Sequence, residues 1–308
     1  MLNDLLGIKY PIMQGGMAQI ATGEFAAAVS NAGALGIIAT GGFSAEQLIA
    51  EIHRARELTD KPFGVNLMLM HPQLPELVKI VADERVAVVT TGAGDPSSYI
   101  PIFKDVGIKV FPVVAATALA VRVAREGADA VIAEGTESGG HVGEATTMAL
   151  VPQVCSAVDI PVIAAGGIAS GAQLLASFAL GAVGAQLGTL FLASNECPIH
   201  QNYKDALIAA RDSGTVVTGR SAGAPVRIIK NRMAREYVKL ERDGADRDTL
   251  EELTLGALRR AVFDGDTATG SLMAGQVAGQ IKNIRPLSEI LDTLWRELEE
   301  TKAAVAQL

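Results

Sequence analysis

The amino-acid sequence predicts a (β/α)8 TIM barrel with a small helical lobe inserted after the eighth strand. Eight short apolar runs recur through the first two thirds of the chain, and each run is apolar throughout rather than alternating. The segments between the runs have helical patterning. Continuous apolar runs are typical of parallel strands that are buried on both faces. The alternative is an open, doubly wound sheet, and the count of eight strands favours the barrel.

The eight predicted strands begin 19 to 32 residues apart, which leaves room for a strand, a helix and two loops in each unit. In chain order they are PIMQG from Pro11, LGIIATG from Leu35, FGVNLM from Phe63, VAVVTTG from Val86, KVFPVV from Lys109, ADAVIAEG from Ala128, IPVIAAGG from Ile160 and AVGAQLGT from Ala182.

The segment from Ser44 to Leu58 is one example of the helices predicted between the strands. Its apolar positions Leu48, Ile49 and Ile52 have helical spacing and are interspersed with charged residues such as Glu51, as on an amphipathic helix. Ser44 followed by Gln47 three residues later fits a capping box, which predicts that the helix begins there.

The chain of 308 residues is longer than a bare barrel, which needs about 250. The strand and helix rhythm ends after Thr189. Residues 195–267 are more polar and are predicted to form a lobe that covers the active site, while residues 1–194 and 268–308 form the barrel. The lobe's predicted helices are Asn202 to Asp212, Val226 to Glu241 and Asp248 to Phe263. The segment Gly270 to Gly279 then returns the chain to the barrel mouth, and a last helix from Leu287 to about Gln307 packs outside.

Composition excludes several classes of protein. Hydrophobic residues make up 49% of the chain, enough for a sizeable core, and the net charge of −8 argues against a nucleic-acid-binding protein. No apolar run reaches the roughly 18 residues that a membrane span needs. Cys155 and Cys197 lie far apart without metal-ligand spacing, so we expect no metal site and a reduced, cytoplasmic location.

Two pairs of residues after the last strands predict a phosphate site. Gly166-Gly167 follows the seventh strand and Gly188-Thr189 follows the eighth. Loops at these positions commonly hold a phosphate in such barrels, where glycine allows close approach and a helix N-terminus attracts anions. Tight turns without a ligand are the alternative, but both pairs at the expected strands favour the phosphate site.

Three amide side chains, Gln14, Asn66 and Gln186, lie in or just after predicted strands. A buried amide without a partner costs about 1–3 kcal/mol, so each needs a hydrogen bond. The partner is either nearby backbone or the ring or hydroxyl groups of a cofactor. The cofactor is favoured for Asn66, and both options stay open for the two glutamines.

The stretch EGTESGGHVGEATT follows the sixth strand and contains His141, the candidate catalytic residue. Its glycine neighbours would leave the ring uncovered, and an ordinary histidine pKa near 6.5 suits proton transfer at neutral pH. Glu134 and Glu137 are candidates for binding the hydroxyl groups of a cofactor or substrate or for orienting His141. Glu144 is interpreted as a helix-start carboxylate. The remaining histidines, His53, His71 and His200, are predicted to be structural or solvated.

Five short motifs in order resemble the nitronate monooxygenase-like flavoproteins, which are FMN-binding (β/α)8 barrels: QGGM, GVN, ESGGH, AAGGI and QLGT. Four longer segments look most similar to the flavin-dependent, type II enoyl-acyl-carrier-protein reductases within that group: ESGGHVGEATTMALVPQV, TTGAG, GAPVRIIKNRMAREY and FDGDTATGSLMAGQVAG. The resemblance covers almost the whole chain, and the lobe is where it is aligned least securely.

The resemblance implies a set of site residues. His141 matches the family's catalytic histidine. The implied FMN contacts are Gly15, Gly16, Met17, Asn66, Gly166, Gly167, Gln186, Gly188 and Thr189. Gly139 and Gly140 would lie near the flavin, with Glu134 as a further candidate, and Met273, Gly275 and Gln276 would close over it. The resemblance also implies NADH or NADPH as electron donor and a homodimer, and it leaves a monovalent cation requirement open.

The implied reaction is the reduction of an enoyl thioester on acyl carrier protein, the last step of the fatty-acid elongation cycle. FMN carries the hydride, and His141 would polarise the thioester oxygen, supply the proton, or do both. The alternative is a nitronate monooxygenase, in which the same histidine acts as a base and dioxygen reoxidises the flavin. A non-catalytic FMN-binding scaffold is the third hypothesis, but it would need no histidine among glycines.

The predicted lobe helix is rich in basic residues: Arg227, Lys230, Arg232, Arg235 and Lys239. A solvated helix face is the simpler interpretation. The alternative is a docking patch for an acidic acyl carrier protein, because complementary charge speeds encounter.

Overall fold

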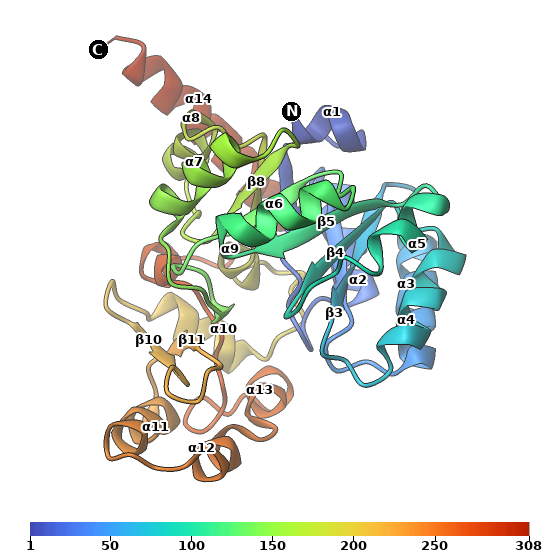
Figure 1. Ribbon diagram of the computed structural model, residues 1–308. Coiled ribbons are helices and arrows are strands. Elements are labelled where there is room, and N and C mark those ends of the chain that lie inside the picture. Colours follow the sequence, from blue (N-terminus) through green and yellow to red (C-terminus); the bar gives the residue numbers. More distant parts are fainter. Residues whose placement is uncertain (308) are drawn as a thin grey trace.

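The computed structural model describes residues 1–307 and contains the predicted barrel in its upper half (Figure 1). All eight predicted strands are confirmed, and they are parallel in the order β1-β9-β8-β6-β5-β4-β3-β2. Gln14 N–H donates to Leu35 O at 2.9 Å and Leu35 N–H donates to Ile12 O at 3.0 Å, which brings the two end strands together. The strands are β1 (Ile12–Gln14), β2 (Gly36–Ala39), β3 (Phe63–Met68), β4 (Val88–Gly92), β5 (Lys109–Val114), β6 (Val131–Glu134), β8 (Val162–Ala165) and β9 (Gly184–Leu187).

Helices follow the strands and cover the outside of the barrel. The predicted capping box is confirmed, since Ser44 Oγ accepts from Gln47 N–H at 3.3 Å and Gln47 Oε1 accepts from Ser44 N–H at 2.8 Å. The C-terminal helix α14 (Leu287–Val305) packs against α8, as predicted. The other helices of the barrel are α1 (Leu2–Leu6), α2 (Gly23–Ala32), α3 (Ala45–Leu58), α4 (Leu74–Glu84), α5 (Ile100–Asp105), α6 (Thr117–Arg125), α7 (Thr147–Ala157), α8 (Gly171–Ala179) and α9 (Thr189–Leu192).

Two apolar layers explain why the strands are apolar at every position. Ile132 and Ile163 point into the barrel interior, and Leu2 from α1 fills the end at which the strands begin, opposite the lobe. Their neighbours Val131 and Val162 belong to the larger cluster between strands and helices. Because each strand is buried on both faces, alternation between inside and outside does not produce alternation between apolar and polar.

The segment after α9 forms the lobe below the barrel (Figure 1). Its elements are α10 (Gln201–Ile208), β10 (Thr215–Thr218), β11 (Val226–Ile229), α11 (Arg232–Arg242), α12 (Arg247–Thr254), α13 (Ala257–Arg259) and a π-helical turn at Arg260–Asp264. A separate core of Ile228, Met233, Tyr237 and Leu250 holds it together. The boundaries between the lobe and the barrel, predicted at residues 195 and 267, remain a prediction.

The lobe is not purely helical, which corrects the prediction. The helix predicted from Val226 begins only at Arg232, after Asn231 caps it by accepting from Ala234 N–H at 2.8 Å. The preceding VRII pairs instead with TVVT of β10, because β-branched residues favour a paired strand. The helix predicted from Asp248 to Phe263 is also interrupted, at Gly256, whose φ is +67°.

A two-residue strand joins the barrel to the lobe. β7 (Gly140–His141) lies in the loop after β6 and pairs antiparallel with β11, so that His141 is opposite Val226 and Gly140 is opposite Arg227. The resulting sheet has the order β10-β11-β7. The loop with the candidate catalytic histidine is therefore part of the lobe's sheet.

Residues 270–280, called the strap below, run from the lobe back to the barrel mouth as predicted. Ile229 N–H donates to Leu272 O at 2.8 Å, which aligns the strap along β11. The buried Tyr203 of α10 donates its hydroxyl to Met273 O at 2.7 Å. The strap ends in a 3₁₀ helix, Gln276–Gln280.

Candidate active site

The residues predicted to bind a cofactor lie at the carboxyl ends of the strands. The loop after β1 lies beside the ends of three other strands: Gly15 is near Gln186, Gly16 is near Asn66, and Met17 is near Gly188. A Cβ on Gly16 would lie only 2.3 Å from Asn66 Cγ. The absence of a side chain at Gly16 therefore allows β3 to approach the loop closely.

The strap closes against the same mouth. Gly275 N–H donates to Thr189 Oγ1 at 2.9 Å, and Gln276 N–H donates to Glu137 O at 2.9 Å. A Cβ on Gly139 would lie 2.6 Å from the Ala274 backbone. The predicted Met273, Gly275 and Gln276 thus lie next to the loop after β6, and their role in binding a cofactor stays a prediction.

The loops after β8 and β9 present free backbone donors. Gly166 and Gly167 have consecutive positive φ angles of 89° and 74°, an arrangement that can turn successive N–H groups toward an anion. Within residues 1–307, no protein group accepts a hydrogen bond from the N–H of Gly167, Gly188 or Thr189.

The N–H groups at the start of α8 are less available to an anion than the sequence suggested. Gln173 N–H donates to Ser170 Oγ at 3.3 Å, and Ala169 N–H donates to Gln173 Oε1 at 2.8 Å. The helix end is therefore partly capped by its own side chains. An anion would be bound by the glycine loop and the start of α9.

Two further observations test whether these residues fit a bound flavin. A Cβ on Gly15 or Gly188 would meet nothing closer than 3.7 Å, and neither residue has a positive φ angle, so the protein itself does not require glycine there. The buried Gln14 Nε2 also has no hydrogen-bond partner among residues 1–307. Glycines that leave room and an unpaired buried donor fit a site that is completed by a ligand.

The sequence left two kinds of partner open for the amide side chains, nearby backbone or a cofactor, and within residues 1–307 the structure shows a backbone partner only for Gln14. Gln14 Oε1 accepts from the backbone N–H of Ile37 at 3.1 Å, which matches the structural option for that half of the amide. Asn66 Nδ2 donates to Thr90 Oγ1 at 2.9 Å, and the contact with a cofactor remains a prediction.

His141 lies on the rim of the mouth, with an exposed side chain. Among the hydrogen bonds of residues 1–307 there is none to its ring. Desolvation by the surrounding protein lowers the pKa of His141 from 6.5, so the neutral imidazole predominates at pH 7. Gly140, with φ of 74°, and the packed Gly139 shape the backbone that presents it.

The other three histidines are committed elsewhere. His71 Nε2 lies 3.0 Å from Phe43 O, and its Nδ1 accepts from Gln73 N–H at 3.1 Å, so its structural loop role is confirmed. His53 is exposed and pairs with a carboxylate on α4, and His200 is exposed at the N-terminus of α10. His141 is therefore the histidine that is available for chemistry.

Glu134 is a partly buried carboxylate at the end of β6. Burial raises its pKa to about 7, while the hydrogen bond that it accepts from Ser138 Oγ at 3.2 Å acts in the opposite direction. It can therefore hold a proton near neutral pH, which is unusual for a glutamate.

Glu137 and Glu144 have roles that differ from the prediction. Glu137 accepts from the N–H of Thr147 at 2.9 Å and from its Oγ1 at 3.0 Å, so it caps α7. Glu144, expected at the helix start, is exposed and pairs with Arg220 of the lobe. The loop folds back on itself, which brings the more distant carboxylate to the helix.

Arg227 was assigned to the basic surface, and that assignment was wrong. Its side chain is 6% exposed, and its Nε and Nη2 donate to Thr136 O at 3.1 and 3.0 Å. Burial lowers its pKa, as does the nearby Arg220, whereas Glu137 raises it. Arg227 is buried because it lies on a strand rather than on an exposed helix face. Its contact with the His141 loop carried no signal in the sequence.

Comparison with known proteins identifies the family. The sequence profile of the nitronate monooxygenase family matches residues 1–297. The chain belongs to this family. The family resemblance drawn from the motifs is therefore confirmed, and so is the barrel.

Solved structures and curated relatives of the nitronate monooxygenase family cover nearly the entire chain. FabK from Thermotoga maritima is 48% identical with a TM-score of 0.97, covering 99% of this chain and 98% of its own. A nitroalkane oxidase from Streptomyces ansochromogenes is 32% identical with a TM-score of 0.88, covering 99% of both chains. A hydroxy-methyl-oxo-octahydroindene-carboxyl-CoA dehydrogenase from Mycobacterium tuberculosis is 32% identical, covering 95% of this chain and 94% of its own.

The family and these neighbours indicate a flavin-dependent oxidoreductase. Within residues 1–307, no helix combines the length and the apolar character that crossing a membrane requires.

Proposed function

We propose that the protein is an FMN-dependent reductase of trans-2-enoyl thioesters carried on acyl carrier protein, with NADH or NADPH as electron donor. The observation that carries this proposal is the 48% identity with FabK, an enoyl-acyl-carrier-protein reductase of type II, over almost the whole chain. Identity with the nitroalkane oxidase is 32% over the same span. A homodimer, a cytoplasmic location, a place in fatty-acid synthesis and a monovalent cation requirement remain predictions.

The residues at the barrel mouth would hold FMN. The free N–H groups of Gly167, Gly188 and Thr189 suit its phosphate, and Gly15 leaves room beside β9. When bound, FMN supplies hydride transfer between the nicotinamide and the substrate. The strap, which is hydrogen-bonded to Thr189, would limit the access of water to the site.

His141 would act on the thioester. Its ring makes no hydrogen bond within the described part of the chain, so it is free to donate one to a substrate oxygen. Reduction places negative charge on the thioester oxygen, and a donor there lowers the barrier. A proton must also reach the α-carbon, and His141 is the candidate for that step as well. The partly buried Glu134, with a pKa of about 7, is a second group near the mouth that can hold a proton.

Nitronate oxidation is the second candidate function. The pKa of His141 is lowered from its usual value, and a neutral imidazole is the form that can take a proton from a nitro compound. The similarity to the nitroalkane oxidase also supports this alternative.

Anaerobic reduction of the bound flavin separates the two functions. For the reductase, NADH or NADPH should bleach the flavin, and a crotonyl thioester should then restore its absorbance without oxygen. For the oxygenase, a nitronate should bleach the flavin and the nicotinamides should not. Flavin that neither donor reduces would contradict both and would favour a non-catalytic flavoprotein.

A further inference from the structure

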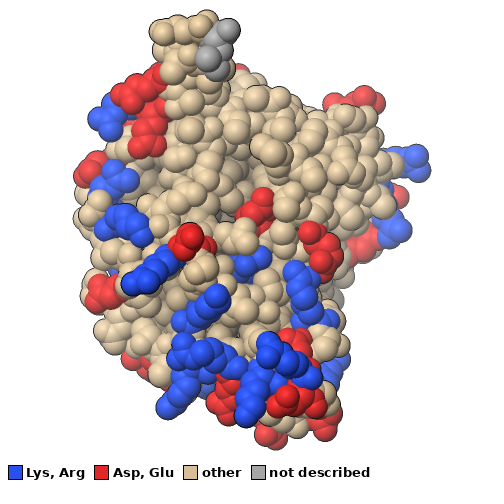
Figure 2. Space-filling model, turned by 90° about the vertical axis from the view of Figure 1, so that its left-hand side faces the viewer, with Lys and Arg blue, Asp and Glu red and all other residues tan. Residues whose placement is uncertain are grey.

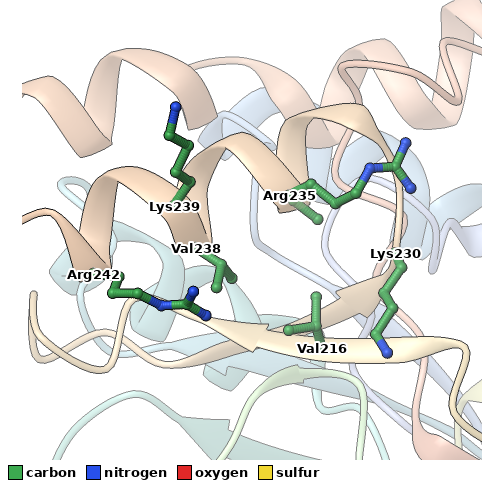
Figure 3. Close-up of a pocket in the computed structure, with 7 residues that line it drawn as sticks. Val216, Lys230, Arg235, Val238, Lys239 and Arg242 are labelled. Atoms are coloured by element: carbon green, nitrogen blue, oxygen red, sulfur yellow. The ribbon is translucent and has the colours of Figure 1, made fainter.

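A cationic groove lies on the outer side of the lobe, between α11 and β10. It has a volume of about 240 Å³. Val216, Ala234 and Val238 form its apolar part, as Figure 3 shows for the two valines. Four basic side chains surround it: Lys230, Arg235, Lys239 and Arg242.

The charge of this region differs from that of the rest of the chain. Residues 195–267 contain 12 basic and 12 acidic residues, so the net charge of −8 falls entirely on the remainder of the chain. Within residues 213–242 there are seven basic residues and only two acidic ones. Figure 2 shows Lys and Arg gathered over the lower part of the face that it draws, with Asp and Glu side chains beside them at the lower edge. The lobe therefore presents a local positive surface on an acidic protein.

Acidic side chains in the vicinity do not neutralise the groove. Glu241 accepts from Ser221 N–H at 2.8 Å and from its hydroxyl at 2.7 Å, and Glu144 pairs with Arg220. No carboxylate lines the groove. Among the ion pairs of residues 1–307, none involves a basic residue of the groove. These cations are therefore available to an external partner.

The groove is extended rather than focused on one point. Arg235, Lys239 and Arg242 follow one another along one side of α11, over about 10 Å at 1.5 Å per residue. Figure 3 shows that the four charged ends point in different directions. A single phosphate group would be bound by convergent donors. A row of separate cations beside an apolar strip suits the acidic, partly apolar surface of a protein.

The groove lies close to the candidate catalytic loop. β10, which supplies Val216, is the edge strand of the sheet whose other edge is β7 with His141. Strands in a sheet are about 4.8 Å apart, so the two edges are separated by roughly 10 Å. A partner bound on the outer side could extend a flexible arm around this small sheet to the mouth.

We infer that the groove between α11 and β10 docks the acidic face of the acyl carrier protein that presents the enoyl thioester. This inference rests on the proposed function and adds the surface that recognises the carrier. It also corrects the set of basic residues derived from the sequence: Arg227 is buried, Arg232 does not line the groove, and Arg242 does. Complementary charge is expected to speed encounter and to fix the orientation of the carrier.

The test compares two double charge reversals in the flavin-loaded protein. Arg235→Glu with Lys239→Glu changes the groove. Lys79→Glu with Arg125→Glu is the matched control. It changes two exposed cations on α4 and α6 of the barrel that form no ion pair within the described part of the chain. Each variant is assayed with crotonyl-acyl carrier protein and with crotonyl-N-acetylcysteamine, and its affinity for the carrier is measured directly by fluorescence anisotropy.

The groove variant should bind the carrier at least about tenfold more weakly and raise KM for the carrier-bound substrate by a similar factor. Its kcat with the small thioester should stay within about twofold of wild type, and the control should resemble wild type in every assay. An equal effect of both variants, or unchanged carrier affinity in the groove variant, would overturn the docking surface. So would a matching loss of NADH or NADPH affinity, which would assign the groove to a nucleotide.

Failure of the proposed function gives a different pattern. In that case wild type reduces neither thioester, whatever its affinity for the carrier. The anisotropy measurement of carrier binding tests the docking surface independently of turnover. If the wild-type protein does not bind the carrier, the docking surface is contradicted. Flavin content and thermal midpoint identify a misfolded variant, and Arg235→Ala with Lys239→Ala then repeats the test with a milder change.

Discussion

The Arg227 guanidinium donates two hydrogen bonds to the carbonyl oxygen of Thr136, from Nε at 3.1 Å and from Nη2 at 3.0 Å. Thr136 lies in the loop that leads to His141, and β11, which carries Arg227, pairs with β7. The lobe therefore holds the loop of His141 both through backbone pairing and through one buried side chain.

Replacing Arg227 should loosen that loop without removing the flavin. In Arg227→Lys a single ammonium replaces the planar fork, so the double contact with Thr136 cannot form. We expect kcat to fall by about tenfold and amide exchange across residues 136–141 to accelerate. Arg227→Met should also lower stability by about 1–3 kcal/mol, because a buried carbonyl loses its partner. Arg232→Lys, an exposed change on α11, is the control, and equal kinetics in the two lysine variants would contradict this role.

His141→Ala should separate the two halves of the reaction. Loss of a proton donor typically reduces the rate by about 10² to 10⁴, so turnover of the enoyl thioester should fall in that range. Flavin content and the rate of flavin reduction by the nicotinamide should change little. Stopped-flow spectroscopy measures the two steps separately, with His53→Gln on exposed α3 as the control. Near-normal reoxidation by the thioester would remove His141 from the mechanism.

Glu134→Gln should change the dependence of stability on pH. The pKa of Glu134 is raised in the folded protein to about 7, so its contribution to stability is complete below pH 4.5 and is lost as the pH rises through about 7. The shift corresponds to roughly 3 kcal/mol at most. Glutamine stays neutral, so the thermal midpoint of Glu134→Gln should exceed that of wild type by a growing margin from pH 5 to pH 7.5. Parallel curves for the two proteins would show that Glu134 is ionised in the fold. Glu252→Gln, at an exposed carboxylate of α12, should run parallel to wild type.

Gly188→Ala should weaken flavin binding while leaving the fold intact. The added Cβ would meet nothing closer than 3.7 Å and the φ angle is ordinary, so the flavin-free protein should melt within about 1 °C of wild type. A methyl group beside the free N–H of Thr189 should nevertheless hinder a phosphate, raising the Kd for FMN by about tenfold. Fluorescence titration with FMN measures the effect. Gly92→Ala, where a Cβ also has open space, is the control, and an equal loss of affinity there would argue against a phosphate site at α9.

The barrel could be predicted from the sequence because its signals are local. Each strand is a continuous apolar run, and glycines at the ends of β8 and β9 occupy the positions where such barrels bind phosphate. His141 could be selected as a candidate for a similar reason, since it is the histidine within a glycine-rich loop after a strand.

The sheet of the lobe could not be predicted because its signals are distant. β7 has only two residues, and its partner strand β11 is distant in the sequence: Val226, which pairs with His141, comes 85 residues after it. The segment VRII is short enough to fit a helix or a strand, so periodicity alone could not decide. The burial of Arg227 and its contact with Thr136 follow from that pairing. Glu137 was missed as the cap of α7 for the same reason, because it reaches the helix only after the loop folds back.

β11 lies between the part of the lobe that holds the His141 loop and the part that carries the proposed docking groove. Its one edge aligns the loop of His141, and its other edge carries β10 and, beyond it, the exposed part of α11. Substitutions on that outer side need not disturb the reaction centre. An engineer could therefore exchange β10 and the outer face of α11 between homologues to redirect partner choice, while β11 keeps the chemistry unchanged.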